Sequence, residues 1–186
     1  MGETTSATGV GTGSDTARRR FGIIDSPVGE LLAVAEAGAL GGLYFTPHQY
    51  PPAPESIGPQ VSVAEDKVLA ATAEELGEYF AGQRTHFSIA VSTNGDAFSE
   101  SVWQLLREIP YGDTWTYADL AVRLGNKHLA QRVGQSVGHN PVSIIVPCHR
   151  VIGADGSLTG FAGGLDRKRY LLSLEEPAPE AAGRLF

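Results

Sequence analysis

The residues best suited to chemistry are Cys148, His149 and Arg150, which follow one another directly at the end of a short apolar run. Cys148 is the only cysteine of the chain. The thiolate is the reactive form of cysteine, and a neighbouring imidazolium or guanidinium stabilises it. A cysteine with a histidine is therefore a candidate nucleophile, provided that a third group orients the imidazole. The alternative interpretation is a small buried hydrophobe, which is common for a lone cysteine among Ile and Val.

The residues before Cys148 predict the element that positions it. Residues 144–146 are Ile, Ile and Val, which favour a short buried strand or an extended segment. Pro147 lacks an N–H group and disfavours helix at the preceding residue, so pairing should end there. We therefore expect Cys148 to follow a rigid element directly. On an extended chain the Cys148 and His149 side chains point to opposite sides, so we expect a water molecule to link them.

Composition and charge exclude several classes of protein. One cysteine excludes an internal disulfide and a cysteine-rich zinc site, and His48 and His86 are isolated from other metal ligands. The net charge is −7, but almost all of the excess lies in residues 1–93, while residues 113–150 are weakly positive at +2. That distribution permits contact with nucleic acid without requiring it. No apolar run is long enough to cross a membrane, so we expect a cytoplasmic protein.

The first half of the sequence predicts a small antiparallel sheet followed by a helix. Three short β-type runs between residues 21 and 45 are separated by turn residues. Apolar residues at helical spacing predict a helix over 63–81, closed by Gly82. The expected organisation is a disordered tail, an N-terminal sheet-and-helix domain, a C-terminal domain that carries the chemistry and a second tail, over residues 1–19, 20–92, 93–176 and 177–186.

The second half predicts a helix-turn-helix. After a helix over 98–108, Thr116 and Asp119 form a capping box that begins a helix over 117–124, and another helix follows over 127–137. The last of these has an inward apolar side and a polar side with donors and no carboxylate. The polar side consists of His128, Gln131, Arg132 and Gln135. Solvation and contact with DNA both remain open for this face. A final helix is expected over 166–174.

The order of these motifs resembles the O6-alkylguanine-DNA alkyltransferases from about residue 98 to residue 175. The resemblance rests on Pro147-Cys148-His149-Arg150, Asn140-Pro141, Gly160-Phe161-Ala162-Gly163-Gly164, Val102-Trp103, Ile109-Pro110-Tyr111-Gly112 and Leu171-Leu172-Ser173-Leu174-Glu175. The whole ordered set is specific, and it favours the nucleophilic interpretation of Cys148. It implies an α+β fold, with a ribonuclease-H-like first domain that carries no chemistry and a mostly helical second domain.

The resemblance also implies an activity and a set of roles. The protein would repair DNA by moving the alkyl group of O6-alkylguanine, and of O4-alkylthymine, to Cys148, with His149 as the base and Glu175 as the group that orients it. Tyr117 would rotate the nucleotide out of the duplex and donate to the departing guanine. Asn140 would brace the recognition helix against the active-site segment. The pocket for the extruded base would be bordered by Val151, Phe161 and Ala162.

The DNA-binding residues implied by the resemblance are Tyr117, Gln131, Arg132, Gln135 and Asn140, reaching the duplex from the minor groove. The family usually has an arginine that fills the gap left by the flipped base, and Gln131 occupies that position here. Arg132 lies about 100° further round the helix. We therefore predict that Gln131 fills the gap and that Arg132 contacts phosphate. A second departure is Phe161, where the family usually has tyrosine.

The sequence predicts no cofactor and no metal, because no glycine-rich nucleotide motif follows a strand and no ligand cluster is present. The expected partner is double-stranded DNA, bound by a monomer that makes no membrane contact. A thioether is a poor leaving group, so each molecule should act once. Three other functions remain open: a non-catalytic binder of alkylated DNA that recruits repair factors, a helix-turn-helix regulator with a structural cysteine, and a cysteine hydrolase.

Overall fold

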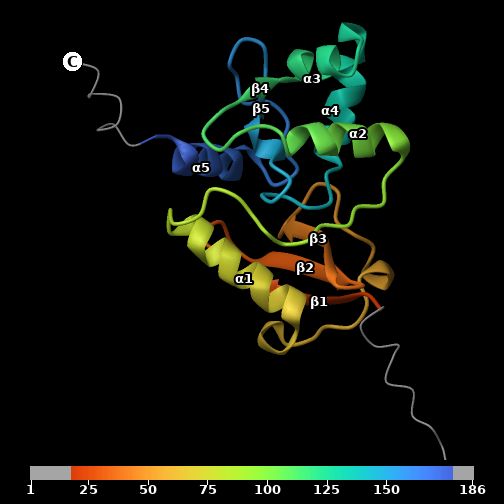
Figure 1. Cartoon of the computed structure of the whole chain (residues 1–186), viewed down its shortest axis with the longest axis vertical. Coiled ribbons are helices and arrows are strands. Elements are labelled where there is room, and N and C mark those ends of the chain that lie inside the picture. Colours follow the sequence, from red (N-terminus) through yellow and green to blue (C-terminus); the bar gives the residue numbers. More distant parts are fainter. Residues whose placement is uncertain (1–17, 178–186) are drawn as a thin grey trace, which may run out of the picture.

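The computed structural model describes residues 18–177, so the predicted tails lie outside the described residues except for their innermost positions. Figure 1 shows a sheet and its helix α1 at one end of the molecule and the helices α2, α3 and α4 at the other, with α5 between them. The fold is α+β, as predicted. Within residues 18–177, no helix is long and apolar enough to cross a membrane.

The N-terminal half is a three-stranded antiparallel sheet covered by one helix. The strands β1 (Arg20–Ile24), β2 (Leu31–Glu36) and β3 (Ala39–Phe45) pair in sequence order. Helix α1 (Lys67–Phe80) begins where the Asp66 carboxylate accepts hydrogen bonds from the first backbone N–H groups. Its buried apolar side chains pack against the sheet. The three strands and the helix are where the sequence predicted them, but the helix begins at Lys67 instead of 63, because Asp66 caps it and residues 63–65 form a separate 3₁₀ turn.

The C-terminal half contains the predicted helix-turn-helix. Helix α2 (Ala97–Leu106) precedes α3 (Tyr117–Arg123), which starts with the predicted capping box of Thr116 and Asp119. Helix α4 (Ala130–Gly138) is shorter than the predicted helix over 127–137. Its expected first turn is instead a separate 3₁₀ turn, because a side-chain cap from Asn126 begins a tighter turn there.

Two short elements and a last helix complete the fold. The strands β4 (Trp115–Thr116) and β5 (Val151–Ile152) pair in parallel, and they join the start of α3 to the residues that follow Cys148. Helix α5 (Leu165–Glu175) matches the predicted final helix within one residue at each end. Glu175 is the last residue of α5, and its carboxylate is buried in the interior.

The strand predicted over 144–146 is wrong. Val142 makes a single bridge to Leu43 of β3, and the next residues form turns in which Ile144 adopts a positive φ of 71°. The reason is a side chain: Asn140 accepts from Val142 N at 3.0 Å and donates to Val146 O at 2.8 Å. These two hydrogen bonds, called the Asn140 bracket below, fold residues 141–146 back on themselves. Burial of these residues compensates for the strained backbone of Ile144.

The two halves share one hydrophobic core. Leu43 of β3 exchanges two backbone hydrogen bonds with the segment after Asn140, through Pro141 O at 2.8 Å and Ser143 N at 3.0 Å. Gly163 packs against the Phe45 ring so closely that a Cβ there would lie 2.3 Å from a ring carbon. A domain boundary near residue 92 remains a prediction.

Candidate active site

Cys148 begins a 3₁₀ turn, η4 (Cys148–Arg150), directly after Pro147. The expectation of an extended chain at this point is therefore wrong. The residue is buried, and burial raises the pKa of its thiol, while a hydrogen bond from Asn140 and the charge of Lys168 act in the opposite direction. The thiol is consequently neutral at rest and needs a base before it can attack.

One carboxylate, that of Glu175, organises the residues behind the thiol. Its Oε1 accepts hydrogen bonds from His149 Nε2 at 2.7 Å and from Arg150 Nη2 at 2.9 Å. Its Oε2 accepts from Arg150 Nε at 2.8 Å, and the same guanidinium donates to Ile109 O at 2.7 Å. A fourth donor, the Tyr79 hydroxyl, lies 2.7 Å from Oε1. All of these side chains are buried.

The protonation states of His149 and Glu175 follow from these contacts. Burial alone would raise the pKa of Glu175, but the hydrogen bonds from His149 and Arg150 lower it to about 2. Burial lowers the pKa of His149 in spite of the neighbouring carboxylate. A neutral imidazole that donates from Nε2 to a carboxylate leaves Nδ1 as its proton acceptor. That atom is buried and has no hydrogen-bond partner among the described residues.

Lys168 supplies a second buried cation close enough to Cys148 for their charges to interact. Its side chain is fully buried on α5, and Nζ donates to Val151 O at 2.5 Å and to Thr159 O at 3.0 Å. Burial lowers the pKa of Lys168 to about 8, and only the thiolate form of Cys148 opposes that effect. The ammonium is therefore still mostly charged at neutral pH. It ties β5 to the loop that contains Thr159.

A cavity of about 390 Å³ is connected to this group through two of its lining residues, because Thr159 O accepts from Lys168 Nζ and the charge of Cys148 acts on the Tyr117 hydroxyl. Five of the predicted site residues line it, namely Tyr117, Gln131, Gln135, Phe161 and Ala162. The Tyr117 hydroxyl donates to Thr159 O at 3.2 Å, the same carbonyl that Lys168 holds. Gln49 and Tyr50 of the N-terminal half also line it.

The other predicted site residues lie behind or beside this cavity. Cys148, Val151 and Asn140 are buried and do not line it. Arg132 is also absent from the lining, and its guanidinium carbon lies 3.8 Å from the centre of the Phe98 ring on α2. Gln131 and Arg132 therefore face different surroundings.

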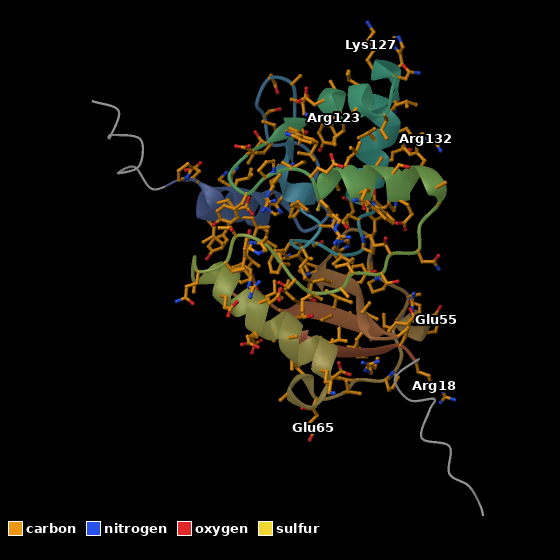
Figure 2. All side chains as sticks on the ribbon, viewed as in Figure 1. Arg18, Glu55, Glu65, Arg123, Lys127 and Arg132 are labelled. Atoms are coloured by element: carbon orange, nitrogen blue, oxygen red, sulfur yellow. The ribbon has the colours of Figure 1, made fainter. Side chains whose placement is uncertain are left out.

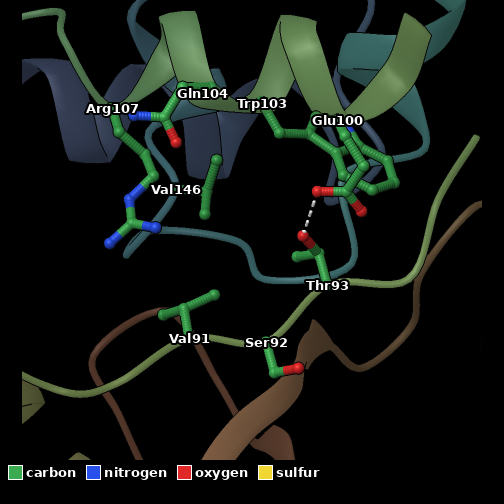
Figure 3. A pocket seen from close by; sticks show the side chains of 8 residues that line it. All are labelled: Val91, Ser92, Thr93, Glu100, Trp103, Gln104, Arg107 and Val146. Carbon is green, nitrogen blue, oxygen red and sulfur yellow. Dashed lines mark hydrogen bonds between the residues drawn. The ribbon is translucent and has the colours of Figure 1, made fainter. Parts of the chain in front are cut away.

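A second cavity, of about 280 Å³, lies between α2 and the segment that joins the two halves (Figure 3). Thr93 donates to the Glu100 carboxylate at 2.7 Å across one end of it. Its lining includes no residue of the thiol group and none of the polar face of α4. Within residues 18–177, no three His, Cys, Asp or Glu side chains gather as metal ligands would.

Three residues of the site were not predicted from the sequence. Arg150 was noted only as a cation next to Cys148, and the structure makes it the main partner of Glu175. Lys168 lies in an Arg-Lys-Arg run that is typical of an exposed helix face. Tyr79 belongs to the half that was expected to carry no chemistry. The one sequence signal was the position of Lys168 at helical spacing from the apolar Leu171, which places both residues on the buried side of α5.

Fold and site together define the class of protein: a helix-turn-helix protein with a buried cysteine beside a histidine–glutamate pair. The family model for the 6-O-methylguanine DNA methyltransferase DNA-binding domain matches residues 97–177. The methylated-DNA–protein-cysteine methyltransferase of Mycolicibacterium paratuberculosis is 42% identical over 164 residues, which cover 88% of this chain and 96% of the relative. A Haemophilus influenzae protein of the same name is 43% identical, covering 81% of this chain and 83% of its own length.

Solved structures are also similar. The crystal structure of Mycobacterium tuberculosis OGT in complex with DNA matches with a TM-score of 0.77 and 39% identity, covering 84% of this chain and 92% of that one. The structure of the Mycobacterium tuberculosis O6-methylguanine methyltransferase matches with a TM-score of 0.76 and 38% identity over 89% of this chain and 99% of that one. The chain belongs to the methylated-DNA–protein-cysteine methyltransferase family.

Proposed function

We propose that the protein repairs double-stranded DNA directly, by transferring the alkyl group of O6-alkylguanine to Cys148 once per molecule. The observation that carries this proposal is the geometry around the thiol. The only cysteine lies next to a neutral imidazole whose Nδ1 is free to accept a proton, and an ionised carboxylate holds the opposite nitrogen. The names of the relatives describe transfer from methylated DNA to a protein cysteine.

The transfer follows from this arrangement with atoms and charges balanced. His149 Nδ1 takes the thiol proton, and the sulfur attacks the alkyl carbon. The bond from that carbon to the guanine O6 breaks, and its electron pair passes into the ring. The Tyr117 hydroxyl donates a proton to the departing guanine, and the tyrosinate recovers one from solvent as the imidazolium releases its own. The products are normal guanine and S-alkyl Cys148.

The basic end of the molecule supports an approach of DNA to the helix-turn-helix. Figure 2 shows Arg123, Lys127 and Arg132 at the end formed by α3 and α4, whereas Glu55 and Glu65 lie at the opposite end together with one labelled cation, Arg18. Lys and Arg side chains near phosphate supply most of the non-specific affinity for DNA. A base within the duplex cannot present its O6 to a buried thiol, so the nucleotide is rotated out into the cavity lined by Tyr117. We propose that a monomer does this from the minor groove.

The test is a mass measurement combined with a titration. Incubation with a duplex that contains O6-methylguanine should add one methyl group to the tryptic peptide that contains Cys148. With excess duplex, repaired guanine should reach a plateau equimolar with protein, because the thioether is not regenerated. The variant Cys148→Ser should bind the duplex and repair none of it. Product formation that continues past equimolar would contradict single turnover, and binding without a mass gain in the wild type would favour a non-catalytic binder.

Gln131 and Arg132 should have separable effects on DNA. Gln131 lines the cavity, so Gln131→Ala should slow repair in duplex more than repair in single strands, since only a duplex leaves a gap to fill. Arg132 stacks on Phe98 outside the cavity, where it is expected to contact a phosphate and not the base gap. Arg132→Ala should therefore weaken binding to all duplexes alike and reduce the salt slope by about one contact. Single-turnover rates and salt titrations measure both.

Each of these variants controls for the other. Gln131→Arg should restore or raise the duplex rate, because it returns charge and reach to the cavity edge. If Arg132→Ala alone removes the duplex advantage, Arg132 is the residue that fills the gap, and the roles of the two residues are exchanged.

A further inference from the structure

A tyrosine from the N-terminal half reaches the carboxylate that organises the thiol. Tyr79 lies in α1 and is fully buried. Its hydroxyl donates to Glu175 Oε1 at 2.7 Å, the same oxygen that accepts the His149 Nε2 proton at 2.7 Å. No residue of the sheet-and-helix half was expected to take part in the chemistry.

We propose that Tyr79 is a positioning residue for alkyl transfer: by donating a hydrogen bond to Glu175 Oε1, its hydroxyl limits how strongly the carboxylate attracts the His149 proton. This inference rests on the function proposed above for Cys148. Tyr79 touches neither thiol nor substrate, and it acts only through Glu175.

Packing does not account for the Tyr79 hydroxyl. The ring lies among other aromatic rings, with centroids 5.3 Å from Phe80, 5.3 Å from Phe87 and 6.3 Å from Tyr111. A phenylalanine would fill the same space. A buried hydroxyl is costly unless it has a partner, and its partner here is the Glu175 carboxylate.

The charges around His149 show what this hydrogen bond changes. Arg150 and Lys168 lie near the imidazole and oppose its protonation, whereas Glu175 favours it. Glu175 in turn faces Tyr79 from α1, Arg150 from η4 and Tyr111 from the turn after α2. Each hydrogen bond that a carboxylate accepts stabilises part of its negative charge and weakens its attraction for other donors. Without the Tyr79 hydroxyl, Glu175 attracts the imidazole proton more strongly.

A more basic His149 should slow alkyl transfer at low pH. An imidazole that is already protonated on Nδ1 cannot accept the thiol proton. The transfer rate should therefore fall on the acid side, at the pH at which His149 becomes charged. Removing the Tyr79 hydroxyl raises that pH, so the acid limb of the rate profile moves upward.

The experiment compares Tyr79→Phe with Tyr111→Phe. The control removes a hydroxyl that donates to the backbone carbonyl of Leu174 at 3.3 Å instead of to the carboxylate. We expect Tyr79→Phe to move the acid limb of the single-turnover rate upward by ~0.5 pH unit, which is about threefold slower on that limb. The control should move the limb less than Tyr79→Phe does, because the Tyr111 hydroxyl faces the carboxylate without a hydrogen bond to it. In a Glu175→Gln background, Tyr79→Phe should cause no further shift of the acid limb.

A second measurement is independent of DNA. The ¹⁵N shifts of His149 in the free protein should titrate at higher pH in Tyr79→Phe than in the wild type. An unmoved rate limb and an unmoved titration, in a folded variant, would overturn the inference. A rate loss that is equal at every pH would overturn it too, since it would indicate packing only. If the wild type itself transfers no alkyl group, the proposed function fails, while the titration still tests Tyr79.

Discussion

Replacing Glu175 by Gln should slow alkyl transfer at least about 100-fold. The amide is neutral, so it cannot stabilise the imidazolium that forms when His149 takes the thiol proton. In the wild type, Arg150 Nε donates to Glu175 Oε2 at 2.8 Å. In the variant, an amide N–H group at that position would face the guanidinium instead of accepting from it. A buried guanidinium without its carboxylate costs about 3 kcal/mol or more of stability. Affinity for DNA should change little, because Glu175 lies behind the thiol and not on the surface of α4.

The same substitution should change how stability depends on pH. The pKa of Glu175 is lowered from 4.5 to about 2 in the folded protein. The unfolded state therefore binds more protons between these values, and the carboxylate contributes about 3 kcal/mol above pH 4.5 that is lost as the pH falls to 2. Urea unfolding of the wild type should show this decline, and Glu175→Gln should lack that component.

Asp166→Asn is the matched control for Glu175→Gln. Asp166 lies on the same helix, α5, and its carboxylate pairs with Arg169 at 3.0 Å while fully exposed to solvent. Removing that charge should leave the transfer rate unchanged and should alter stability little, because exposed pairs contribute little. A Glu175→Gln variant that keeps the wild-type single-turnover rate would show that the glutamate serves stability alone.

Elements with strong local signals were predicted well from the sequence. The capping box of Thr116 and Asp119 lies where the first helix of the helix-turn-helix begins, because both of its partners are within four residues. The three strands and α1 likewise follow their local hydrophobic periods. In each case the residues that determine the element are close neighbours in the sequence.

The segment before Cys148 shows where local reasoning ends. Three successive β-branched residues favour a strand, yet Ile144 has a positive φ that β-branched residues rarely adopt. The hydrogen bonds from the Asn140 side chain and the burial of the whole segment outweigh that preference. Propensity says nothing of either effect, because both depend on which side chains the complete fold brings together.

The site divides in the same way. The Cys148 and His149 pair was visible from residue types alone, and the role of Glu175 came from family resemblance. Tyr79 is 96 residues from Glu175 in the sequence, and no periodicity connects the two. Lys168 was hidden because a lysine between two arginines is typical of a solvated helix. Its burial becomes evident only once two backbone carbonyls are found at its Nζ.

Replacing Asn140 by Ala should destabilise the protein by about 3 kcal/mol and slow transfer by about 100-fold, because the segment that positions Cys148 loses its support. The amide bonds Val142 N at 3.0 Å and Val146 O at 2.8 Å, and both groups are buried. Unsatisfied buried groups cost about 1–3 kcal/mol each, and Ile144 is free to relax from its strained φ once the bracket is gone. Cys148 also loses the hydrogen bond that lowers the pKa of its thiol.

Asn126→Ala is the matched control for Asn140→Ala. Its side chain caps the 3₁₀ turn before α4 by accepting from His128 N at 3.0 Å, and it is exposed. It should cost about 1 kcal/mol or less and leave the transfer rate unchanged. Equal losses of transfer in both asparagine variants would show that Asn140 acts through general stability and not through the bracket.

Asn140→Asp separates the bracket from the thiol. A carboxylate can still accept from Val142 N, but it cannot donate to Val146 O, and its charge beside Cys148 raises the pKa of the thiol. Transfer should therefore be slower than in Asn140→Ala at neutral pH. Below neutral pH, burial favours the protonated acid, which can donate to Val146 O, so in that range the folded state should hold a proton that the unfolded state releases. The stability of Asn140→Asp should consequently fall as the pH rises above about 4, opposite to the trend from Glu175. Urea unfolding at several pH values measures this trend, and a stability that rises with pH would show that Asn140 does not donate to Val146 O.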